Sequence, residues 1–382
     1  MKNHQTIQTQ RQKYETWSKV AIIILNYNGW QDTIECLESV LRNDHPNYQV
    51  IVVDNGSPNN SMEYIKAWAE GRQEVLTPEP GHPLYNLSHP PVKKPISYIY
   101  YTREEAEKGG DFKLEERITE GWQKQRKFFN NKELISTSLY PLIFIQTGEN
   151  LGFAGGNNVG IRYALKQRAE YVLILNNDTQ VEKNILLAMV EAAQENEAGV
   201  VGAVIKDANT KNILFIKSFY PYMFFYSEPQ RSIPKNKWWL THQVNGSAML
   251  LHKDLLIERY RELGYFLDAS LFLYCEEIEL AMWCLQKKIK SIIAGEAIVY
   301  HKVGTSSGGR GKPIQFYYLT RNRVLLAHRY LGGLFRILFA ASYLFWRIIR
   351  AGMYITQGRW EVSRAILQGL LDGYRKKIGP RL

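Results

Sequence analysis

The sequence lacks the features that mark several classes of protein. Its 382 residues contain only three cysteines, Cys36, Cys275 and Cys284, an odd number without metal-ligand spacing, which excludes a disulfide scaffold and fits a reducing compartment. Residues 1–18 are polar and carry no basic start followed by an apolar core, so we expect a flexible N-terminus and no signal peptide. No repeat of fixed period and no low-complexity tract occurs. With 45% hydrophobic residues, the composition is that of a globular protein and excludes disorder and collagen.

The phosphate-binding motifs of two common nucleotide-binding folds are also missing. No G-x-x-x-x-G-K-[ST] segment occurs, and residues 149–158 (ENLGFAGGNN) do not match G-x-G-x-x-G, so a P-loop NTPase and a dinucleotide-binding fold are disfavoured. This segment follows an apolar run and opens a helix; its glycines permit close backbone approach, and a helix N-terminus favours phosphate. Its candidate ligand-binding residues are Asn150, Gly155, Gly156 and Asn157.

Negative charge is almost absent from the C-terminal part of the chain. The formal net charge is +11, and residues 310–382 hold 14 bases and two acids, which gives +12 for this part. The first 309 residues hold 34 bases and 35 acids, so the body is close to neutral. The tail has no zinc-finger spacing and no RNP-like motif, and nucleic acid is therefore not expected as a partner.

The tail also lacks an apolar run long enough to span a membrane. Its longest uncharged apolar stretch, residues 337–346, is too short for about 30 Å of hydrocarbon. At about 100° per residue of a helix, Arg329, Arg336 and Arg347 fall within about 20° of one another, with Arg350 about 60° away. Such an arginine stripe on an apolar helix predicts an anchor lying on an anionic membrane surface. A helix packed on the core with a solvated face is the alternative.

Apolar strands alternate with amphipathic helices along most of the chain. Runs buried on both faces are expected at 20–25, 50–53, 142–146, 171–175 and 200–205. Helical spacing follows at 32–41, 62–68, 155–165 and 185–193. The pattern predicts an α/β fold with a mostly parallel sheet flanked by helices.

Residues 72–140 break this alternation with proline-rich and charged stretches. A structureless loop of this length is unusual in a compact domain, so we expect an insertion with helix around 113–130 that covers a site. The predicted organisation is a flexible segment at 1–18, a body at 19–310 that contains the insertion, and a helical tail at 311–382.

Three of the predicted strands end in polar residues. Asn26 and Asn28 follow the first, Asp54 follows the second, and Asn177 and Asp178 follow the strand at 171–175. Ligands of open parallel sheets bind outside the carboxyl ends of the strands, which predicts a polar ligand pocket, with turns alone as the alternative. A carboxylate at Asp178 suits Mg²⁺ or Mn²⁺ bridging the phosphates of a ligand.

Two further segments carry titratable side chains next to apolar runs. Glu276 and Glu277 follow the run LFLY and head a helix whose inner side is expected to carry Leu280, Cys284 and Leu285. A carboxylate led into the interior has a raised pKa and can act as a general base, whereas acids in a first helical turn are also favoured by the helix dipole. His301 ends a strand before a Gly/Ser loop at 302–309 and is a candidate metal or phosphate ligand, with a structural histidine as the alternative.

The order of these segments resembles the family-2 glycosyltransferases of GT-A fold, with the closest likeness to the rhamnosyltransferase-like branch. The match spans roughly residues 19–330 without 72–140. It is carried by seven motifs in order: AIIILNYNGWQDTIECLESV, VIVVDNGS, ENLGFAGGNNVGI, YVLILNNDT, YCEEIEL, AIVYHKVGTSSGG and YYLTRNRVLL.

The resemblance implies a Rossmann-like GT-A fold and an inverting, divalent-metal-dependent sugar transfer from a nucleotide-sugar donor. It places Asn26, Asn28 and Asp54 at the nucleotide, Asn177 and Asp178 in a DXD-like metal site with Asp178 as the ligand, and His301 as a metal or diphosphate ligand. The catalytic base of the family falls on Glu277 of the pair Glu276-Glu277, where the family usually has Asp. The Arg of the family's continuation is replaced by Trp283.

The expected acceptor is a saccharide or lipid-linked hydroxyl in cell-surface polysaccharide or glycolipid synthesis. The expected location is the cytoplasmic face of the plasma membrane, with the protein bound peripherally. Two alternatives stay open on the sequence: a catalytically altered module that binds a sugar nucleotide and a membrane, and a sugar-phosphate nucleotidyltransferase.

Overall fold

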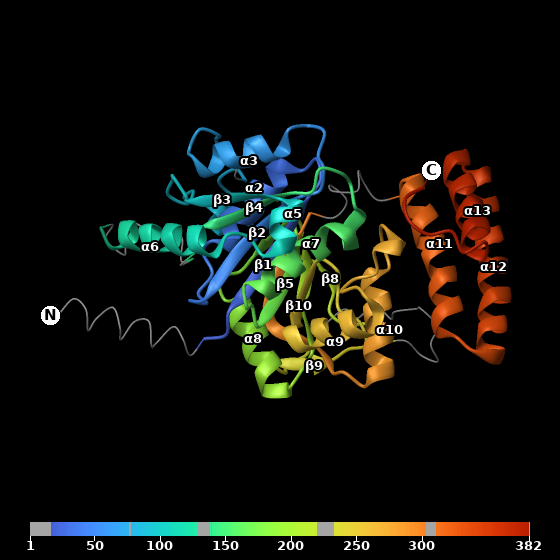
Figure 1. Ribbon diagram of the computed structural model, residues 1–382. Helices are drawn as coiled ribbons and strands as arrows, with labels where there is room; N and C mark the ends of the chain where they lie inside the picture. Colours follow the sequence, from blue (N-terminus) through green and yellow to red (C-terminus); the bar gives the residue numbers. More distant parts are fainter. Residues whose placement is uncertain are drawn as a thin grey trace.

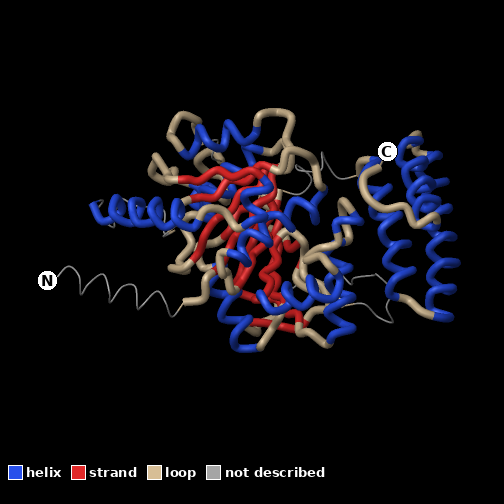
Figure 2. Tube along the Cα trace, viewed as in Figure 1, coloured by secondary structure: helices blue, strands red, loops and turns tan. Residues whose placement is uncertain are grey.

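In the described part of the chain, eleven strands form one mixed sheet at the centre of the protein (Figures 1 and 2). The computed structural model describes residues 17–75, 78–128, 138, 140–219, 233–302 and 311–381. The strands are β1 Val20–Asn26, β2 Tyr48–Asp54, β3 Tyr98–Thr102, β4 Leu142–Gln146, β5 Tyr171–Asn176, β6 Thr179–Val181, β7 Val200–Asp207, β8 Ile213–Phe215, β9 Trp238–Leu240, β10 Ala248–His252 and β11 Ser291–His301.

The sheet is mostly parallel in its first half, as the alternation of strands and helices predicts. The strand order is β3-β4-β2-β1-β5-β10-β7-β11-β6, and β3, β4, β2, β1 and β5 run parallel to one another. β10 lies antiparallel between β5 and β7, and the pair β7–β11 is parallel again. The sequence patterns did not identify β3, β6, β8, β9 and β10, which have three to five residues each.

The helices are α2 Trp30–Val40, α3 Ser61–Ala69, α4 Tyr85–Ser88, α5 Arg103–Lys108, α6 Phe112–Phe128, α7 Gly152–Lys166, α8 Ile185–Asn196, α9 Lys253–Leu263, α10 Glu276–Lys287, α11 Pro313–Tyr330, α12 Gly333–Thr356 and α13 Trp360–Tyr374. α7 begins at Gly152, three residues before the predicted start, so Gly155 and Gly156 lie inside the helix. The expected inner position of Leu285 on α10 is wrong: Leu280 and Cys284 are buried, but Leu285 is exposed because α10 turns it away from the sheet.

Alternate residues of the central strands enter two cores, one on each face of the sheet. Ile22 and Ile24 of β1 belong to the core that α2, α3 and α8 cover, whereas Ala21 and Ile23 belong to the core covered by α7, α9 and α10. This two-residue period is the geometry of a strand, and burial on both faces explains the continuous apolar runs. The result is a three-layer α/β/α body.

The segment 72–140 adds to the sheet and packs on the body. Its strand β3 pairs in parallel with β4 at the sheet edge, and the backbone N–H of Val92 donates to the buried carboxylate of Glu38 on α2 at 2.6 Å. The helix expected around 113–130 is α6, and that the insertion covers a site stays a prediction. Trp122 of α6 donates to the carbonyl of Ser138, whose hydroxyl donates to the carbonyl of Tyr48 at the start of β2. α6 therefore lies at the amino ends of the strands, on the side of the N-terminus in Figure 1.

The C-terminal residues form three helices side by side at the opposite end of the protein, α11, α12 and α13 (Figure 1). The predicted single arginine stripe is wrong, because the chain turns at Gly332 and Gly333, where Gly333 has a φ of 49°. Arg329 therefore lies on α11, where it binds Asp268 of the body at 2.6 Å, and Arg347 on α12 is buried. No helix of the described residues is sufficiently long and apolar to cross a membrane.

The flexible segment expected at 1–18 lies mostly outside the described residues, as do residues 129–137 of the insertion and residues 303–310 of the Gly/Ser loop.

Candidate functional site

Two of the predicted nucleotide-binding residues meet at the carboxyl edge of the sheet. Asn26 ends β1 and Asp54 ends β2, and the two are opposite each other in the parallel register. The Asn26 side-chain amide donates to Asp54 Oδ2 at 2.8 Å, and both side chains are fully buried. The backbone N–H of Ser57 donates to Asp54 Oδ1 at 2.8 Å. Asp54 is thus held rigidly by the turn that follows its strand.

The neighbouring strand ends are tied to the same edge. Asn28 is exposed, has a left-handed φ of 61°, and donates its backbone N–H to the Ser57 hydroxyl at 2.9 Å. The Asn177 side-chain amide donates to Thr33 Oγ1 on α2 at 3.1 Å and to the carbonyl of Gly29 at 3.2 Å. Asn177 therefore links β5 to the first turn of α2, while Asn28 presents its side chain to solvent.

Asp178 and His301 are brought together by strand pairing. β6 and β11 are antiparallel with Thr179 opposite His301, which places His301 Nε2 at 3.1 Å from Asp178 Oδ1. Asp178 is buried and His301 is partly open to solvent. The sequence places them 123 positions apart, so only the sheet topology explains why these two predicted metal ligands are neighbours.

Lys302 next to His301 is a residue that the sequence patterns missed. Its ammonium group lies 2.8 Å from Asp32 Oδ1 and also contacts the carboxylate of Glu35, both on α2. Burial lowers the pKa of Lys302, but the two carboxylates outweigh it and the pKa is raised. Lys302 thereby fastens the end of β11, and with it His301, to α2.

The pair Asp178 and His301 is too small to enclose a metal ion by itself. Among the described residues, no group of three or more His, Cys, Asp or Glu side chains is placed to hold one. A carboxylate oxygen and an imidazole nitrogen within 3.1 Å are nevertheless donors that Mg²⁺ or Mn²⁺ accepts. The residues therefore fit a divalent ion whose remaining ligands come from a bound phosphate group or water.

Three backbone N–H groups at the start of α7 are bound within the protein. The N–H groups of Leu151 and Gly152 donate to the side chains of Asn55 and Asn150 at 3.1 and 2.9 Å. The N–H of Phe153 donates to the carbonyl of Phe272 at 2.8 Å. These three donors are thus occupied, and Asn150 and Asn55 orient the start of α7.

The remaining residues of this motif serve packing. A Cβ on Gly156 would lie 2.5 Å from Leu25 Cδ1 and 3.1 Å from Asn55 Oδ1, and one on Gly155 would lie 2.8 Å from Leu151 Cβ. Asn157 is buried inside α7 and donates to the carbonyl of Phe153 at 2.9 Å. Gly156 lets α7 approach the ends of β1 and β2 closely, and Gly155 leaves room for Leu151 at the start of the helix.

Glu276 and Glu277 occupy the first turn of α10 in different environments. Glu276 is buried, its Oε1 has no hydrogen-bond partner among the described residues, and burial followed by the neighbouring Glu277 raises its pKa to about 8. Glu277 is half-buried and accepts a hydrogen bond from Gln243 at 3.3 Å. Burial also raises the pKa of Glu277, but its own backbone amide and the cation of Arg323 oppose this. At neutral pH the raised pKa favours the neutral form of Glu276, whereas Arg323 and the backbone amide favour the ionised form of Glu277 against its burial.

The loop that leads into these acids is strained and is held by α11. Phe272, Tyr274 and Cys275 all have left-handed φ values, between 63° and 75°. Such conformations are costly for residues with a side chain and persist where surrounding contacts enforce them. Here Asn322 donates to the carbonyl of Tyr274 at 2.7 Å, and Arg321 donates to the carbonyl of Leu271 at 2.7 Å.

Glu279 and Trp283, the continuation of the acidic motif, are structural. Glu279 is fully buried and forms an ion pair with Arg259 of α9 at 2.5 Å, and the hydroxyl of Tyr330 donates to it at 2.6 Å. The guanidinium of Arg259 also lies over the ring of Trp283, with its Cζ 4.8 Å from the ring centroid. These contacts fix α10 between α9 and α11, and Glu276 and Glu277 with it.

Comparisons with known proteins agree with this architecture. Residues 21–79 and 130–259, about half of the chain, match the family Glycosyl transferase family 2. The low-salt glycan biosynthesis hexosyltransferase Agl10 of Haloferax volcanii is 26% identical over 193 residues, covering 48% of this chain and 60% of that protein. The dTDP-rhamnosyl transferase RfbF of Shigella flexneri is 24% identical over 197 residues, covering 48% and 62%.

Among solved structures, S. aureus TarS 1–349 in complex with UDP-GlcNAc is similar with a TM-score of 0.50 and 15% identity, over 94% of this chain and 81% of that chain. The fold is thus a GT-A-like α/β fold with a mixed, mostly parallel sheet and C-terminal helices. The chain spans less than two thirds of the length of the curated relatives it matches, between 38% and 62%. The family match and the fold agree with the order of motifs, and the chain belongs to glycosyl transferase family 2.

Proposed function

We propose that this protein transfers a sugar from a nucleotide-sugar donor to a hydroxyl of a saccharide or lipid-linked acceptor, with inversion at the anomeric carbon. One observation carries the proposal. A pair of carboxyl groups, Glu276 and Glu277, adjoins a loop that contacts α7 at the edge of the sheet where Asp54, Asp178 and His301 lie. A base, a rigid polar edge and a candidate cation site are the parts that such a transfer requires.

The donor nucleotide binds at the ends of β1, β2 and β5 in this proposal. Asn26 and Ser57 hold the carboxylate of Asp54 in a fixed position. In this proposal the carboxylate also accepts hydrogen bonds from the donor. Asn28 is the exposed side chain of this edge and contributes a further polar contact. Asn177 supports the pocket through α2. Gly155, Gly156, Asn150 and Asn157 shape the pocket by packing, without direct contact to phosphate.

Asp178 and His301 would hold a Mg²⁺ or Mn²⁺ ion together with the donor's diphosphate. When bound, the ion supplies positive charge that offsets the charge developing on the leaving diphosphate. Lys302 keeps His301 in place through its contacts with Asp32 and Glu35.

Glu277 acts as the base on the acceptor. The acceptor oxygen forms a bond to C1 of the sugar while the C1–O bond to the diphosphate breaks, and the hydroxyl proton passes to the Glu277 carboxylate. Because attack and departure occur on opposite faces of C1, the anomeric configuration inverts. Arg323 favours the ionised form of Glu277, and its half-buried carboxylate is open to an acceptor. Glu276 remains protonated, so it adds no second negative charge next to the carboxylate of Glu277.

The nature of sugar and acceptor follows from the relatives only as a proposal. The hexosyltransferase and the rhamnosyl transferase support a hexosyl or deoxyhexosyl donor, and a role in cell-surface polysaccharide or glycolipid synthesis. The basic C-terminal helices support an acceptor presented at an anionic membrane surface, at the cytoplasmic face.

Substitution of the two acids tests the proposal. Glu277→Gln is expected to lower kcat by on the order of 10²–10⁴-fold, because an amide cannot accept the proton, and to leave nucleotide binding nearly unchanged. Glu276→Gln is the matched control: it replaces a neutral carboxyl by a neutral amide of the same shape and should retain most of the activity at pH 7. Retained transfer in Glu277→Gln would exclude Glu277 as the base.

A panel of nucleoside diphosphates and nucleotide sugars, tested by thermal shift with and without Mn²⁺, identifies the donor. A ligand that binds the folded state raises the unfolding temperature, so the nucleobase of the donor, its sugar and the metal ion are tested together. The catalytically altered binding module predicts such shifts without transfer to any acceptor and without donor hydrolysis.

A further inference from the structure

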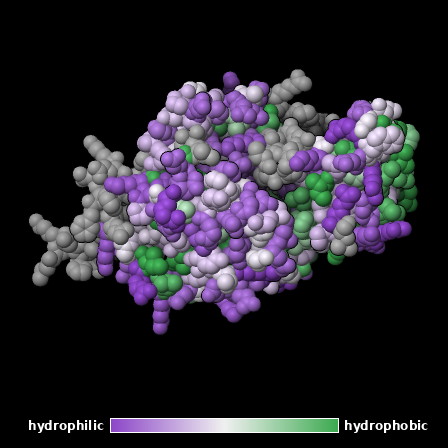
Figure 3. Space-filling model, turned by 90° about the horizontal axis from the view of Figure 1, so that it is seen from above, coloured by the Kyte–Doolittle hydropathy of each residue, from purple (hydrophilic) through white to green (hydrophobic). Residues whose placement is uncertain are grey.

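The outward face of α12 is a continuous apolar surface. Phe339, Arg347 and Ala351 are the buried residues of this helix, and the large apolar side chains of the other positions are exposed, with Leu334 at 67% and Trp346 at 65%. This face, here called the α12 face, comprises Leu334, Phe335, Ile337, Leu338, Leu344, Phe345, Trp346, Ile348, Ile349, Met353 and Ile355. Figure 3 shows hydrophobic residues gathered along the outer edge of the C-terminal helices. An exposed apolar surface of this extent marks an interaction site.

The charges of α12 lie on the opposite side of the helix. At about 100° per residue, Arg336, Arg347 and Arg350 fall within about 60° of one another, and Arg336 is about 180° from Phe345. The helix contains no acidic residue. Arg347 is buried on the protein side, whereas Arg336 and Arg350 are exposed. An apolar half accompanied by exposed arginines on one helix of 24 residues, about 36 Å long, is the pattern of a helix that lies in the plane of a membrane interface.

Charge identifies the occupant of the α12 face. Residues 310–382 carry +12, and of their two acids Asp372 is buried and bound to Lys377, which leaves Glu361 as the exposed one. A second copy of the chain would bring the same excess of positive charge to the interface, and like charges facing each other are unfavourable. An anionic lipid surface attracts the same basic residues, by about 1 kcal/mol for each one near the surface.

We infer that the α12 face inserts into the headgroup and acyl boundary of an anionic bilayer, with the helix axis in the membrane plane. α11 then lies on the protein side of α12 and connects it to the loop before Glu276 and Glu277. This inference specifies how the protein contacts the proposed membrane. It rests on the proposed function only where it assumes that the membrane presents the acceptor.

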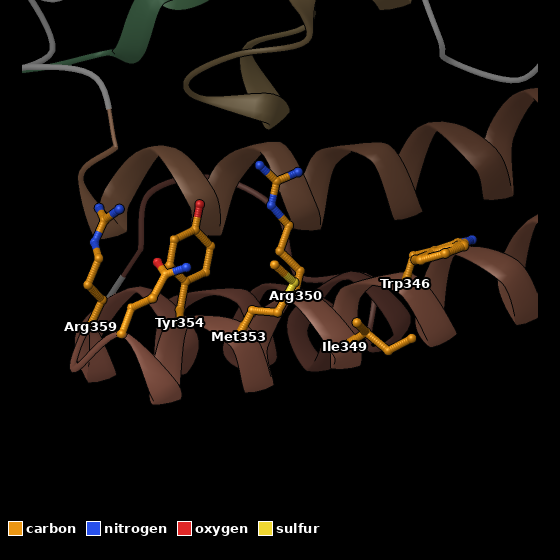
Figure 4. A pocket seen from close by; sticks show the side chains of 7 residues that line it. Trp346, Ile349, Arg350, Met353, Tyr354 and Arg359 are labelled. Atoms are coloured by element: carbon orange, nitrogen blue, oxygen red, sulfur yellow. The ribbon is translucent and has the colours of Figure 1, made fainter.

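A groove at one end of the α12 face combines apolar and cationic side chains. It measures about 560 Å³ and is lined by the apolar side chains of Trp346, Ile349 and Met353 together with Arg350 and Arg359 (Figure 4). Arg359 is oriented by a hydrogen bond to the carbonyl of Gly311 at 2.6 Å. Two guanidinium groups above apolar walls suit a lipid phosphate with its acyl chain beside it. We place the phosphate of an anionic phospholipid headgroup, which carries no compensating positive charge, in this groove.

Vesicle binding of the full chain tests the inference. Co-sedimentation is measured with vesicles of phosphatidylcholine alone and of phosphatidylcholine with phosphatidylglycerol. The wild type should bind the anionic vesicles more tightly, and added salt should weaken this binding. The double variant Phe345→Ser/Trp346→Ser should bind both kinds at least about tenfold more weakly. Phe112→Ser is the matched control, because Phe112 is similarly exposed (55%, against 58% for Phe345) but lies at the other end of the protein.

Arg350→Gln separates the groove from the apolar face. It should weaken binding to anionic vesicles several-fold and leave binding to phosphatidylcholine vesicles unchanged. A wild-type chain that binds its nucleotide but no vesicle would overturn the inference and leave the proposed function intact. A second result would also overturn the inference: the wild type sediments as a dimer without lipid, and Phe345→Ser/Trp346→Ser dissociates this dimer. The α12 face would then be an interface between two copies of the chain. Vesicle binding without binding of any nucleotide would reject the sugar transfer and keep the lipid surface.

Discussion

The side-chain amide of Asn322 on α11 donates to the backbone carbonyl of Tyr274 at 2.7 Å. The same amide lies 3.0 and 2.9 Å from the carbonyls of Leu271 and Leu273, and Asn322 is fully buried. One side chain of the C-terminal helices thus holds the backbone of the strained loop from which Glu276 and Glu277 start. The C-terminal helices are therefore part of the candidate site's structure.

Asn322→Ala should disturb the loop before the acids. Its removal takes this donor from the carbonyls of Leu273 and Tyr274, whereas the Leu271 carbonyl keeps Arg321. A buried carbonyl left without a donor costs about 1–3 kcal/mol, so we expect a lower unfolding temperature. Because the loop sets the position of Glu277, kcat should fall at least about tenfold while the affinity for the nucleotide stays within about twofold.

Thr320→Val on the same helix is the control for this variant. The Thr320 hydroxyl is buried without a hydrogen-bond partner among the described residues, so its replacement should leave stability and kcat unchanged or improve stability slightly. Equal kinetics of Asn322→Ala and the wild type would show that Asn322 stabilises the fold without positioning Glu277.

Glu276 should make the stability of the protein depend on pH. Its pKa in the folded state is raised to about 8, so between about pH 4.5 and 8 the folded protein keeps a proton that the unfolded chain has released. The free energy of unfolding therefore declines as the pH rises through this range, by at most about 1.4 kcal/mol per pH unit from this group. Denaturation of the wild type and of Glu276→Gln between pH 5 and 8 should show a flatter dependence for the variant.

The exposed ion pair between Glu63 and Lys66, at 3.0 Å, offers the matched control. Glu63→Gln should follow the pH dependence of the wild type, because an exposed pair contributes little. If the stability of Glu276→Gln runs parallel to that of the wild type over pH 5–8, Glu276 is ionised in the folded state.

Asp178→Asn should remove the part of nucleotide binding that depends on a divalent ion. An amide oxygen is a weaker ligand than a carboxylate, so the additional thermal stabilisation by Mn²⁺ in the presence of a nucleoside diphosphate is expected to be lost. His301→Ala should reduce it in the same direction. Asp44→Asn changes an exposed carboxylate that pairs with Lys183 at 3.7 Å and takes no part in the contact between Asp178 and His301, and it should keep the full effect of Mn²⁺. An undiminished Mn²⁺ effect in Asp178→Asn would place the ion elsewhere.

Arg259→Met should destabilise the protein strongly. It leaves the buried carboxylate of Glu279 without its 2.5 Å partner, and breaking a buried ion pair costs about 3–5 kcal/mol. Lys287→Met removes the more exposed pair with Glu262 and should cost much less, because solvent screens this pair. Urea denaturation of both variants measures the difference; similar values for the two would mean that Glu279 becomes protonated when Arg259 is lost.

Much of the central fold could be predicted from local patterns. The apolar runs of β1, β2 and β5 are continuous because both faces of the sheet are buried, and their polar ends follow directly in the sequence. The break between α11 and α12 also had a local signal, the pair Gly332-Gly333, which the arginine spacing obscured. The short strand β10 had none, because its run of five residues fits a buried helix as well as a strand.

The sequence by itself determined which chemical groups the protein can use: the polar strand ends, the acidic pair, the terminal histidine and a basic, apolar C-terminal region. Only the tertiary structure decided what each group does. Sheet pairing places His301 beside Asp178, burial distinguishes Glu276 from Glu277, and the hydrogen bonds of Asn322 connect the tail to the acids. These outcomes depend on contacts between residues far apart in the chain, which set solvation and distance, and neither quantity can be read from spacing along the sequence.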